Sequence, residues 1–167
     1  MVVTATFVDK YGRSIATDQN TLTAIPAGRV FYYAGAVFPN VSLTVVAMHL
    51  VLTTTATQPK SLVLPPVSDV LVKPGGSEEE NVTGKLTNPY RIPIPSDGTI
   101  YAVFFNAKGN VVGGNFDLTG AAVEPGATVS FSFSEYPPPE IASARASVDP
   151  CGGSLGTCPV RVPRTAY

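Results

Sequence analysis

One pattern in this chain has the spelling of a catalytic motif. Gly152 to Gly156 reads GGSLG and fits G-x-S-x-G, in which a serine on a sharp turn between a strand and a helix attacks a carbonyl carbon. That chemistry also needs an acid and a histidine later in the chain, and neither residue type follows Ser154. We therefore interpret the match as chance, and we predict that the chain is not an enzyme.

The only histidine of the chain is His49. A histidine that acts as a general base needs a nucleophile within hydrogen-bonding reach, and the residues around it offer no such arrangement. Strand alternation places His49 on the side opposite Met48 and Leu50. We expect a surface or inter-domain histidine, and we include it in a candidate interaction surface.

The two cysteines, Cys151 and Cys158, are separated by six residues, three of them glycine. A structural zinc site needs four ligands at short paired spacings, which two cysteines and one distant histidine do not supply. The short loop lets the sulfurs approach each other, so we predict a disulfide, a bond typical of oxidising compartments. Two reduced thiols in a tail are the alternative.

No metal site or cofactor is expected elsewhere. The only charge run, Ser77 to Glu80, is interpreted as a solvated hairpin tip in preference to a calcium site. Gly113 and Gly114 lack the Lys-Ser/Thr that follows the glycines of a phosphate loop, so they are interpreted as part of a turn.

The elements that carry these residues are predicted to be β-strands. Ile100 to Phe105 and Val129 to Ser134 alternate side chains between two faces, and the second of these segments places Phe next to Ser throughout. Turns are predicted at Asn106 to Gly109 and at Glu124 to Gly126, where glycine supplies the positive φ that such turns require.

A degenerate copy of this pattern opens the chain. Asp9 to Gly12 takes the place of Asn106 to Gly109, and Phe38 to Leu52 matches Tyr136 to Pro150. The chain is therefore interpreted as two copies of one β module. The paired positions are Val3, Ala5 and Phe7 with Ile100, Ala102 and Phe104; Val30, Phe31 and Tyr32 with Val129, Ser130 and Phe131; and Val46, Met48 and Leu50 with Ala144, Ala146 and Val148.

Four segments follow from this repeat: a partial module at 1–57, a proline-stiffened linker at 58–66, a complete module at 67–150 and a tail with the cysteine loop at 151–167. Two candidate strands of the second copy, Val67 to Val72 and Asn81 to Thr87, have no counterpart before Val3. A sheet without its neighbour exposes an edge that invites pairing with another chain. Either the chain is a piece of a longer protein, or something else supplies the missing strands.

The composition limits the classes of partner that we expect for this chain. Charged residues make up 14% of the chain and the formal net charge is −1, so no basic field favours nucleic acid. Apolar runs are shorter than the roughly 18 to 20 residues that span a bilayer, so no transmembrane segment is expected. The residues after Met1 lack the pattern of a signal peptide. Asn40 to Ser42 and Asn81 to Thr83 match the N-glycosylation pattern by chance in a chain that looks bacterial.

Each copy resembles the FxLYD family, the immunoglobulin-like or fibronectin III-like β-sandwich modules of bacterial and archaeal extracellular and envelope proteins. In the second copy the resemblance lies in VTGKLTNP, AVFFNAKGNVV and VEPGATVSFSF, and in the first copy in ATFVDKYGRSI and IPAGRVFYY. The signature is not complete. Its first aromatic is Ala5 or Ala102, its Leu is Phe7 or Phe104, its Tyr is Val8 or Phe105, and its Asp is Asp9 or Asn106.

The resemblance implies an all-β fold of two tandem sandwich modules, the first without its N-terminal strands, at an extracellular or cell-surface location. Two functions are then weighed: a non-catalytic structural spacer or protein-interaction unit, and an assembly component completed by strand addition from another subunit. Neighbouring domains, a protein partner or a homo-oligomer formed through the open first module are the expected contacts.

The first module carries aromatics where the second has serines on its wet face. Phe31 and Tyr33 take the places of Ser130 and Ser132, and with His49 they form the candidate interaction surface. One hypothesis is that another domain or subunit covers the two rings. The alternative is that they pack under the linker or against the second module.

The alternation also predicts two cores. In the first module these are Ala5, Phe7, Ile15, Val30, Tyr32, Val46, Met48 and Leu50. In the second they are Ile100, Ala102, Phe104, Val112, Val129, Phe131, Phe133, Ala144 and Val148.

Overall fold

The computed structural model of the chain describes residues 1–23, 25, 28–35, 44–54, 63–74, 80–135, 141–151 and 158–159. These residues form nine strands, which confirms the all-β fold class. The strands are β1 (Val2–Val8), β2 (Ser14–Thr21), β3 (Ala47–Thr53), β4 (Val67–Pro74), β5 (Glu80–Thr87), β6 (Thr99–Phe105), β7 (Val111–Leu118), β8 (Thr128–Glu135) and β9 (Ser143–Asp149). They belong to two compact units, Met1–Leu22 with Gly35–Thr57 and Thr23–Ala34 with Gln58–Tyr167.

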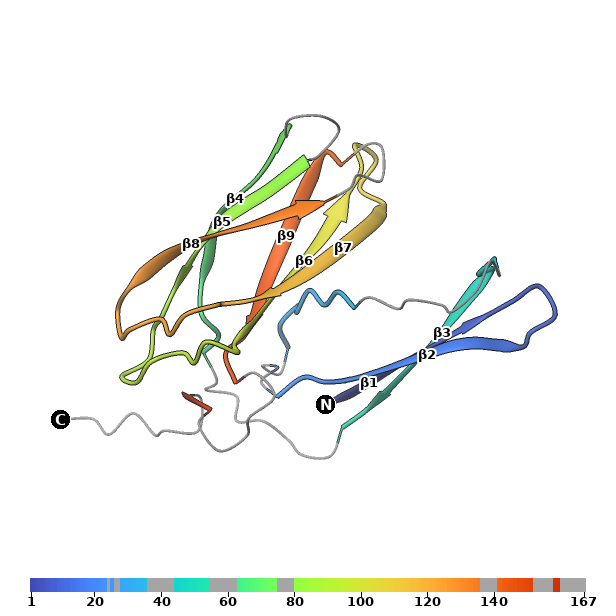
Figure 1. Cartoon of the computed structure of the whole chain (residues 1–167), viewed down its shortest axis with the longest axis horizontal. Helices are drawn as coiled ribbons and strands as arrows, with labels where there is room; N and C mark the ends of the chain where they lie inside the picture. The colour runs from blue at the N-terminus through green and yellow to red at the C-terminus, as the bar shows by residue number, and fades with distance from the viewer. Residues whose placement is uncertain are drawn as a thin grey trace. The chain divides into compact units, whose positions relative to one another are not determined.

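The second unit is built from two antiparallel sheets, ordered β4-β5-β8 and β7-β6-β9, which lie face to face (Figure 1). Alternate residues of β6 point into the space between the sheets because side chains of a strand alternate between its faces. The result is one buried cluster with contributions from both sheets and from the loops. Its members are Val82, Leu86, Ile94, Ile100, Ala102, Phe104, Val123, Phe133, Ile141, Ala144 and Val148.

The predicted core of this unit agrees in part with the cluster. Six of the expected residues are buried in it, while Val112, Val129 and Phe131 are only partly buried against it. The prediction missed the contributions of β5 and the loops, among them Leu86 and Ile94, because the repeat was aligned on segments present in both copies.

The described residues of the first unit form one sheet ordered β2-β1-β3, and its pairing repeats that of β7-β6-β9. On one side, β1 pairs with β2 up to a bulge between Phe7 and Val8, just as β6 pairs with β7 up to a bulge between Phe104 and Phe105. On the other side, β1 pairs with β3 and β6 with β9 over seven positions each, without a shift. Both units thus contain the same three-stranded arrangement.

The turns at the ends of β1 and β6 are also built alike. The side-chain Oδ1 of Asp9 accepts hydrogen bonds from the backbone N–H of Tyr11 (2.8 Å) and of Arg13 (3.0 Å). Asn106 Oδ1 accepts the equivalent pair from Lys108 (2.9 Å) and Asn110 (3.0 Å). Asp and Asn stabilise such turns by satisfying backbone donors two and four residues ahead. Gly12 and Gly109, at φ 76° and 79°, complete the two turns.

The register corrects the sequence alignment of the third strands. Phe7 pairs with Met48 and Phe104 pairs with Ala144, so Met48 corresponds to Ala144, two residues away from the position predicted. The error left the faces unchanged, because a shift of two residues in a strand returns each side chain to the same side.

The predicted core of the first unit is largely wrong. Ala5 is buried and Phe7 and Ile15 are half-buried, whereas Val46, Met48 and Leu50 are 55%, 50% and 54% exposed. The described residues of this unit form one sheet, without the second layer that covers the same face in the other unit. Alternation identified the apolar face correctly, but the large side chains along β3 are exposed where no partner layer is described over them.

The segment Thr23–Ala34 is grouped with the second unit and not with the first, although it lies inside the module predicted at 1–57. Its described residues are not a strand, and Val30, a predicted core residue, is 74% exposed. The physical reason lies in pairing. Strand β8, its predicted equivalent, is hydrogen-bonded to β5, and the described part of the first unit has no counterpart of β5.

A first prediction concerns Gly84, which pairs with Phe131 on the core side of the β4-β5-β8 sheet. A Cβ at this position would meet the Phe131 ring, with Cε1 only 2.8 Å away. We expect Gly84→Ala to destabilise the second unit by about 1 to 3 kcal/mol, the usual cost of overpacking. Chemical denaturation measures it.

The matched control is the double variant Gly84→Ala with Phe131→Leu, in which the smaller side chain makes room for the methyl group. It should be more stable than expected from the sum of the two single changes. Additive effects of the two substitutions would contradict the proposed steric conflict.

A second prediction uses the difference between the two turns. Burial raises the pKa of Asp9, but hydrogen bonds from Arg13 and Tyr11 and the charge of Arg13 outweigh it, so the pKa lies below its ordinary value of 3.8. A lowered pKa in the folded state stabilises the turn at higher pH, and this contribution is lost as the pH falls through the folded-state pKa. Asp9→Asn should keep the two backbone hydrogen bonds, as Asn106 does, and remove this pH dependence.

The measurement is an NMR titration that follows the amide shifts of Tyr11 and Arg13 in acid. The amides of Lys108 and Asn110 serve as internal control, because their acceptor does not titrate. Equal acid shifts at Tyr11 and Arg13 in the wild type and in the Asp9→Asn variant would show that another group governs them.

Candidate functional site

The segment Thr23–Ala34 is attached to strand β9 by polar contacts at both of its ends. The backbone N–H of Thr23 donates to Asp149 Oδ2 (2.7 Å), and the Thr23 hydroxyl donates to Asp149 Oδ1. Near the other end, the backbone N–H of Tyr32 donates to Ser147 Oγ (3.0 Å). The buried carboxylate of Asp149 also accepts a hydrogen bond from the N–H of Cys151 (3.1 Å). One carboxylate therefore ties the segment to the start of the cysteine loop.

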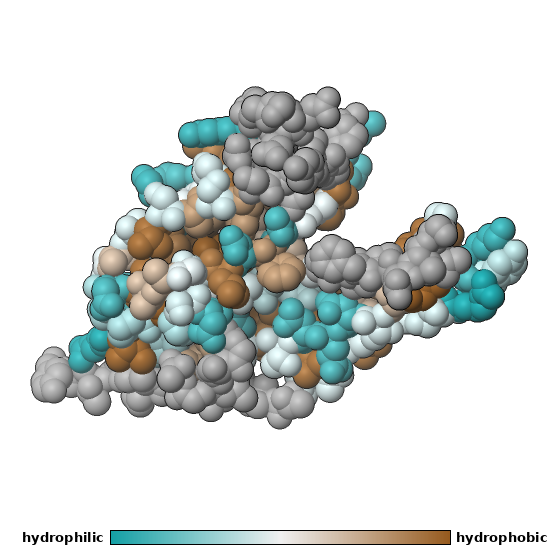
Figure 2. All heavy atoms as spheres, viewed as in Figure 1, coloured by the Kyte–Doolittle hydropathy of each residue, from teal (hydrophilic) through white to brown (hydrophobic). Residues whose placement is uncertain are grey.

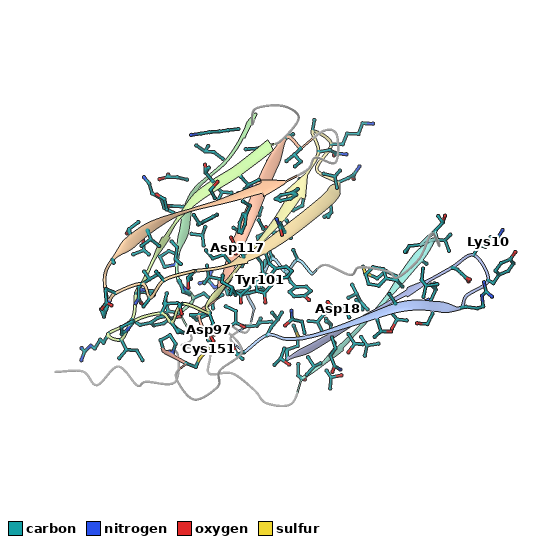
Figure 3. The ribbon with its side chains drawn as sticks, in the orientation of Figure 1. Lys10, Asp18, Asp97, Tyr101, Asp117 and Cys151 are labelled. Carbon is teal, nitrogen blue, oxygen red and sulfur yellow. A yellow bond between two sulfur atoms is a disulfide. The ribbon has the colours of Figure 1, made fainter. Side chains whose placement is uncertain are left out.

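Between these attachments, the segment packs aromatic rings on the outer face of β6. Phe31 and Tyr33 lie against Tyr101, with ring centroids 5.9 Å and 5.2 Å apart, and Tyr32 meets Phe105 edge-to-face at 6.2 Å. Tyr101 and Phe105 point away from Ile100, Ala102 and Phe104, which fill the core. Figure 3 labels Tyr101 on this face. Both faces of β6 are therefore covered, one by a sheet and the other by an aromatic segment.

Close approach of the segment requires a glycine in β7. A Cβ on Gly114 would lie 2.9 Å from the Ala34 methyl carbon and 2.7 Å from the carbonyl oxygen of Ala102. Both contacts are shorter than real side chains allow, so only glycine fits at this position. Gly113 and Gly114, predicted to lie in a turn, lie instead within strand β7.

Covering the face changes the acidity of Tyr101. Burial raises the pKa of its phenol, and the negative charge of Asp149 and the neighbouring Tyr33 add to this effect, to about 12. The neutral phenol is the form that the cluster holds, because ionisation would leave a charge in an apolar setting.

The predicted interaction residues have different surroundings. Phe31 and Tyr33 are half-buried against Tyr101 of the second unit, and whether another domain or subunit also covers them stays a hypothesis. His49 is exposed on β3, opposite Thr6, on the face away from Met48 and Leu50. His49 belongs to the first unit, whereas Phe31 and Tyr33 belong to the second unit. The three residues therefore do not form one surface within the first unit.

The cysteines form the predicted pair. Cys151 and Cys158 are disulfide-bonded with Cα atoms 4.3 Å apart, and both are buried, with Leu64 packed against them. Figure 3 labels Cys151 just beyond β9. Ser154 and the rest of GGSLG lie outside the described residues, as does most of the charge run at 77–80. Within the described residues, no group of three or more His, Cys, Asp or Glu is placed to hold a metal ion.

Sequence reasoning missed Asp149 and Tyr101. Asp149 is one of few buried carboxylates in the described part of the chain, and it directly precedes Pro150 and Cys151. A single acidic residue at the end of a strand gives no sequence pattern that distinguishes a buried carboxylate from a solvated one. Tyr101 alternates with core residues and was assigned to the outer face, but the residues that cover it lie about 70 positions away in the chain, beyond the range of periodicity.

Among the described residues of the first unit, large exposed apolar side chains gather on and just before β3. We call Val46, Met48, Leu50 and Leu52 the β3 strip, because alternation places them on one face. Leu52 is 61% exposed, more than the other three members. Figure 2 shows hydrophilic surface at the β1–β2 turn and hydrophobic surface along the neighbouring part of the same sheet. Because β3 is also an outer strand of its sheet among the described residues, an apolar face and a sheet edge occur together.

A shallow depression of about 590 Å³ lies on the β4-β5-β8 sheet. At one side Lys85 Nζ and Asp69 Oδ2 form an exposed ion pair at 2.8 Å, and this hydrogen bond raises the pKa of Lys85. Asp69 has a positive φ of 52° at the bulge of β4. Leu71 and Phe131 line the depression together with three hydroxyl residues, Thr83, Ser130 and Ser132. Exposed ion pairs such as Lys85–Asp69 contribute little stability. The lining provides no nucleophile and base that form a catalytic pair.

Comparison with protein families, with curated proteins and with solved structures finds no match for this chain. Among the described residues, no helix has the length and apolar character needed to cross a membrane. The functional argument therefore depends on the geometry of the two units.

A third prediction concerns the aromatic cluster. Phe31→Ser together with Tyr33→Ser should expose Tyr101, so its pKa should fall from about 12 toward the ordinary 10.0. A raised tyrosine pKa stabilises the neutral form below the ordinary value, and that contribution is lost as the pH rises through the folded-state pKa. The wild-type cluster should therefore loosen only between about pH 10 and 12.

NMR titration of ring-labelled tyrosine measures this shift. Tyr11→Ser is the matched control, because Tyr11 is 70% exposed and lies in the turn of the first unit. An unchanged Tyr101 pKa in the double variant would show that the segment does not cover the ring in solution.

Proposed function

We propose that the chain is a non-catalytic pair of β modules, of the kind that the FxLYD resemblance implies, and that it acts as a structural spacer or protein-interaction unit in an extracellular or cell-envelope protein. The observation that carries the proposal is the β3 strip. Large aliphatic side chains on one face of a regular sheet are exposed in the first unit, whereas the second unit buries the same face. Contiguous exposed apolar surface is typical of interaction sites.

The alternative is an assembly component whose first unit is completed by strand addition from another subunit. This alternative is favoured by the single sheet of the first unit, which presents β3 as an outer strand with both faces exposed. Backbone groups at such an edge provide the hydrogen bonds used in strand addition.

The proposed location draws support from the cystine. The Cys151–Cys158 pair is buried, and disulfides persist in oxidising environments outside the cytosol. The cystine and Asp149 fix the end of β9, an arrangement suited to a module that transmits position along a longer assembly.

A fourth prediction tests the interaction. A photo-crosslinking amino acid introduced at Leu50 in the intact source cells should join the chain to a second protein, because Leu50 is at the centre of the β3 strip. The same amino acid at His49, one residue away on the opposite face, is the control. Mass spectrometry of the adduct gives the partner's peptide.

The expected result is a specific adduct from Leu50 and little or none from His49. Absence of any protein adduct at Leu50, in cells that contain the chain at normal levels, would contradict an interaction role for this face. Equal labelling at both positions would show nonspecific contact.

A further inference from the structure

The second unit shows what covers the face equivalent to the β3 strip. Strand β9 takes the place of β3, since Ala102 pairs with Ala146 in the same register as Ala5 with Leu50. There, β4 of the opposite sheet lies close to β9, and its residues Val70 and Val72 pack against the buried cluster. The layer over this side of the face is therefore the outer strand of the β4–β5 hairpin.

The two copies differ in side-chain size along this strand. Ala142, Ala144, Ala146 and Val148 of the second unit correspond to Val46, Met48, Leu50 and Leu52. Every member of the β3 strip is the larger of its pair. A covering strand with valines at the positions of Val70 and Val72 would be overpacked against Met48 and Leu50, so it would have to move away or adopt strained rotamers.

The central strand β1 contributes less exposed apolar surface to this face than β3 does. Val3 and Ala5 of β1 are buried, so the uncovered apolar area of this face is concentrated on β3. On the far side of β1, Asp18 and Asn20 of β2 pair with Ala5 and Val3 and thus lie on the same face. Figure 3 labels Asp18 on β2. The face is apolar along β3 and carries one carboxylate, that of Asp18, on β2.

We propose that the β3 strip binds the outer strand of an antiparallel β-hairpin from a partner protein, with small side chains (Gly, Ala or Ser) opposite Met48 and Leu50. The sheet that carries this hairpin has a basic or hydrogen-bond-donating residue where it passes Asp18, because a carboxylate at an interface is best matched by a cation or donor. This inference rests on the proposed interaction function and specifies the partner. The β4–β5 hairpin of a second copy does not meet the description, because it carries Val70 and Val72.

The test uses the full chain and two synthetic hairpins that span residues 67–87, each closed by a disulfide between added terminal cysteines to hold the hairpin shape. One hairpin has the native sequence and the other has Val70→Ala with Val72→Ala. Fluorescence anisotropy with labelled peptide measures the Kd. We expect the alanine hairpin to bind the chain about tenfold more tightly, since overpacking is relieved at two positions.

The reciprocal variant is Met48→Ala with Leu50→Ala, which makes β3 resemble β9. In this chain the order of affinities should reverse, so that the native-sequence hairpin binds more tightly. Thr53→Ala, on the opposite face of the same strand, is the matched control and should leave both affinities unchanged. Circular dichroism of each variant confirms that the strands are retained.

Three outcomes overturn the inference: saturable binding by neither hairpin, equal affinities in both chains, or a concentration-dependent dimer of the chain that Leu50→Asp abolishes. The last result would make a second copy the occupant. If Leu50 crosslinks to a protein in cells while the hairpins show no size preference, the proposed function stands and this inference fails. If the crosslink is absent as well, both fail.

Discussion

Strand β6 is the element on which the second unit depends, because both of its faces are apolar and both have to be covered. Ile100, Ala102 and Phe104 face the β4-β5-β8 sheet, while Tyr101 and Phe105 face the aromatic residues of the segment Thr23–Ala34. Hydrophobic burial contributes roughly 25 cal/mol for each Å² of apolar surface removed from water, so neither layer can be lost cheaply. The hydrogen bonds to Asp149 and Ser147 then hold the outer layer to β9 near both of its ends.

The same requirement explains why the two units differ although their three-stranded sheets share register, bulge and turn. A segment like β8 is stable as a strand only when a neighbour accepts its backbone hydrogen bonds, and in the second unit that neighbour is β5. The described part of the first unit has no such neighbour. The residues aligned with β8 instead donate a backbone hydrogen bond to β9 and pack their aromatic rings on β6. The first unit keeps the sheet and leaves the β3 strip exposed.

The buried core is concentrated in the second unit, whereas the described residues of the first unit expose large apolar side chains. The second unit has a filled core, a cystine at the end of β9 and an aromatic cover, so it is expected to fold as the stable part. The first unit has a turn at Asp9 that is held by an ion pair with Arg13. It also has an apolar strand at its edge, and natural sheets normally avoid or cover such a strand. Large side chains on β3, where β9 carries alanines, give the exposed face a shape different from that of its covered counterpart.

The sequence by itself determined the fold class, the turns and the faces of the strands. Alternation in Ile100 to Phe105 and the Asx turns at Asp9 and Asn106 depend on neighbouring residues, so local patterns carry them. Even the two-residue error in aligning β3 with β9 left the faces correct, because the side-chain period of a strand is two. Only the tertiary structure decided which faces are buried, that Phe31 and Tyr33 cover Tyr101, and that Asp149 joins Thr23 to Cys151. The contacts of Tyr101 with Phe31 and of Asp149 with Thr23 join residues about 70 and 126 positions apart, and burial of a face depends on a layer that the face's own sequence does not encode.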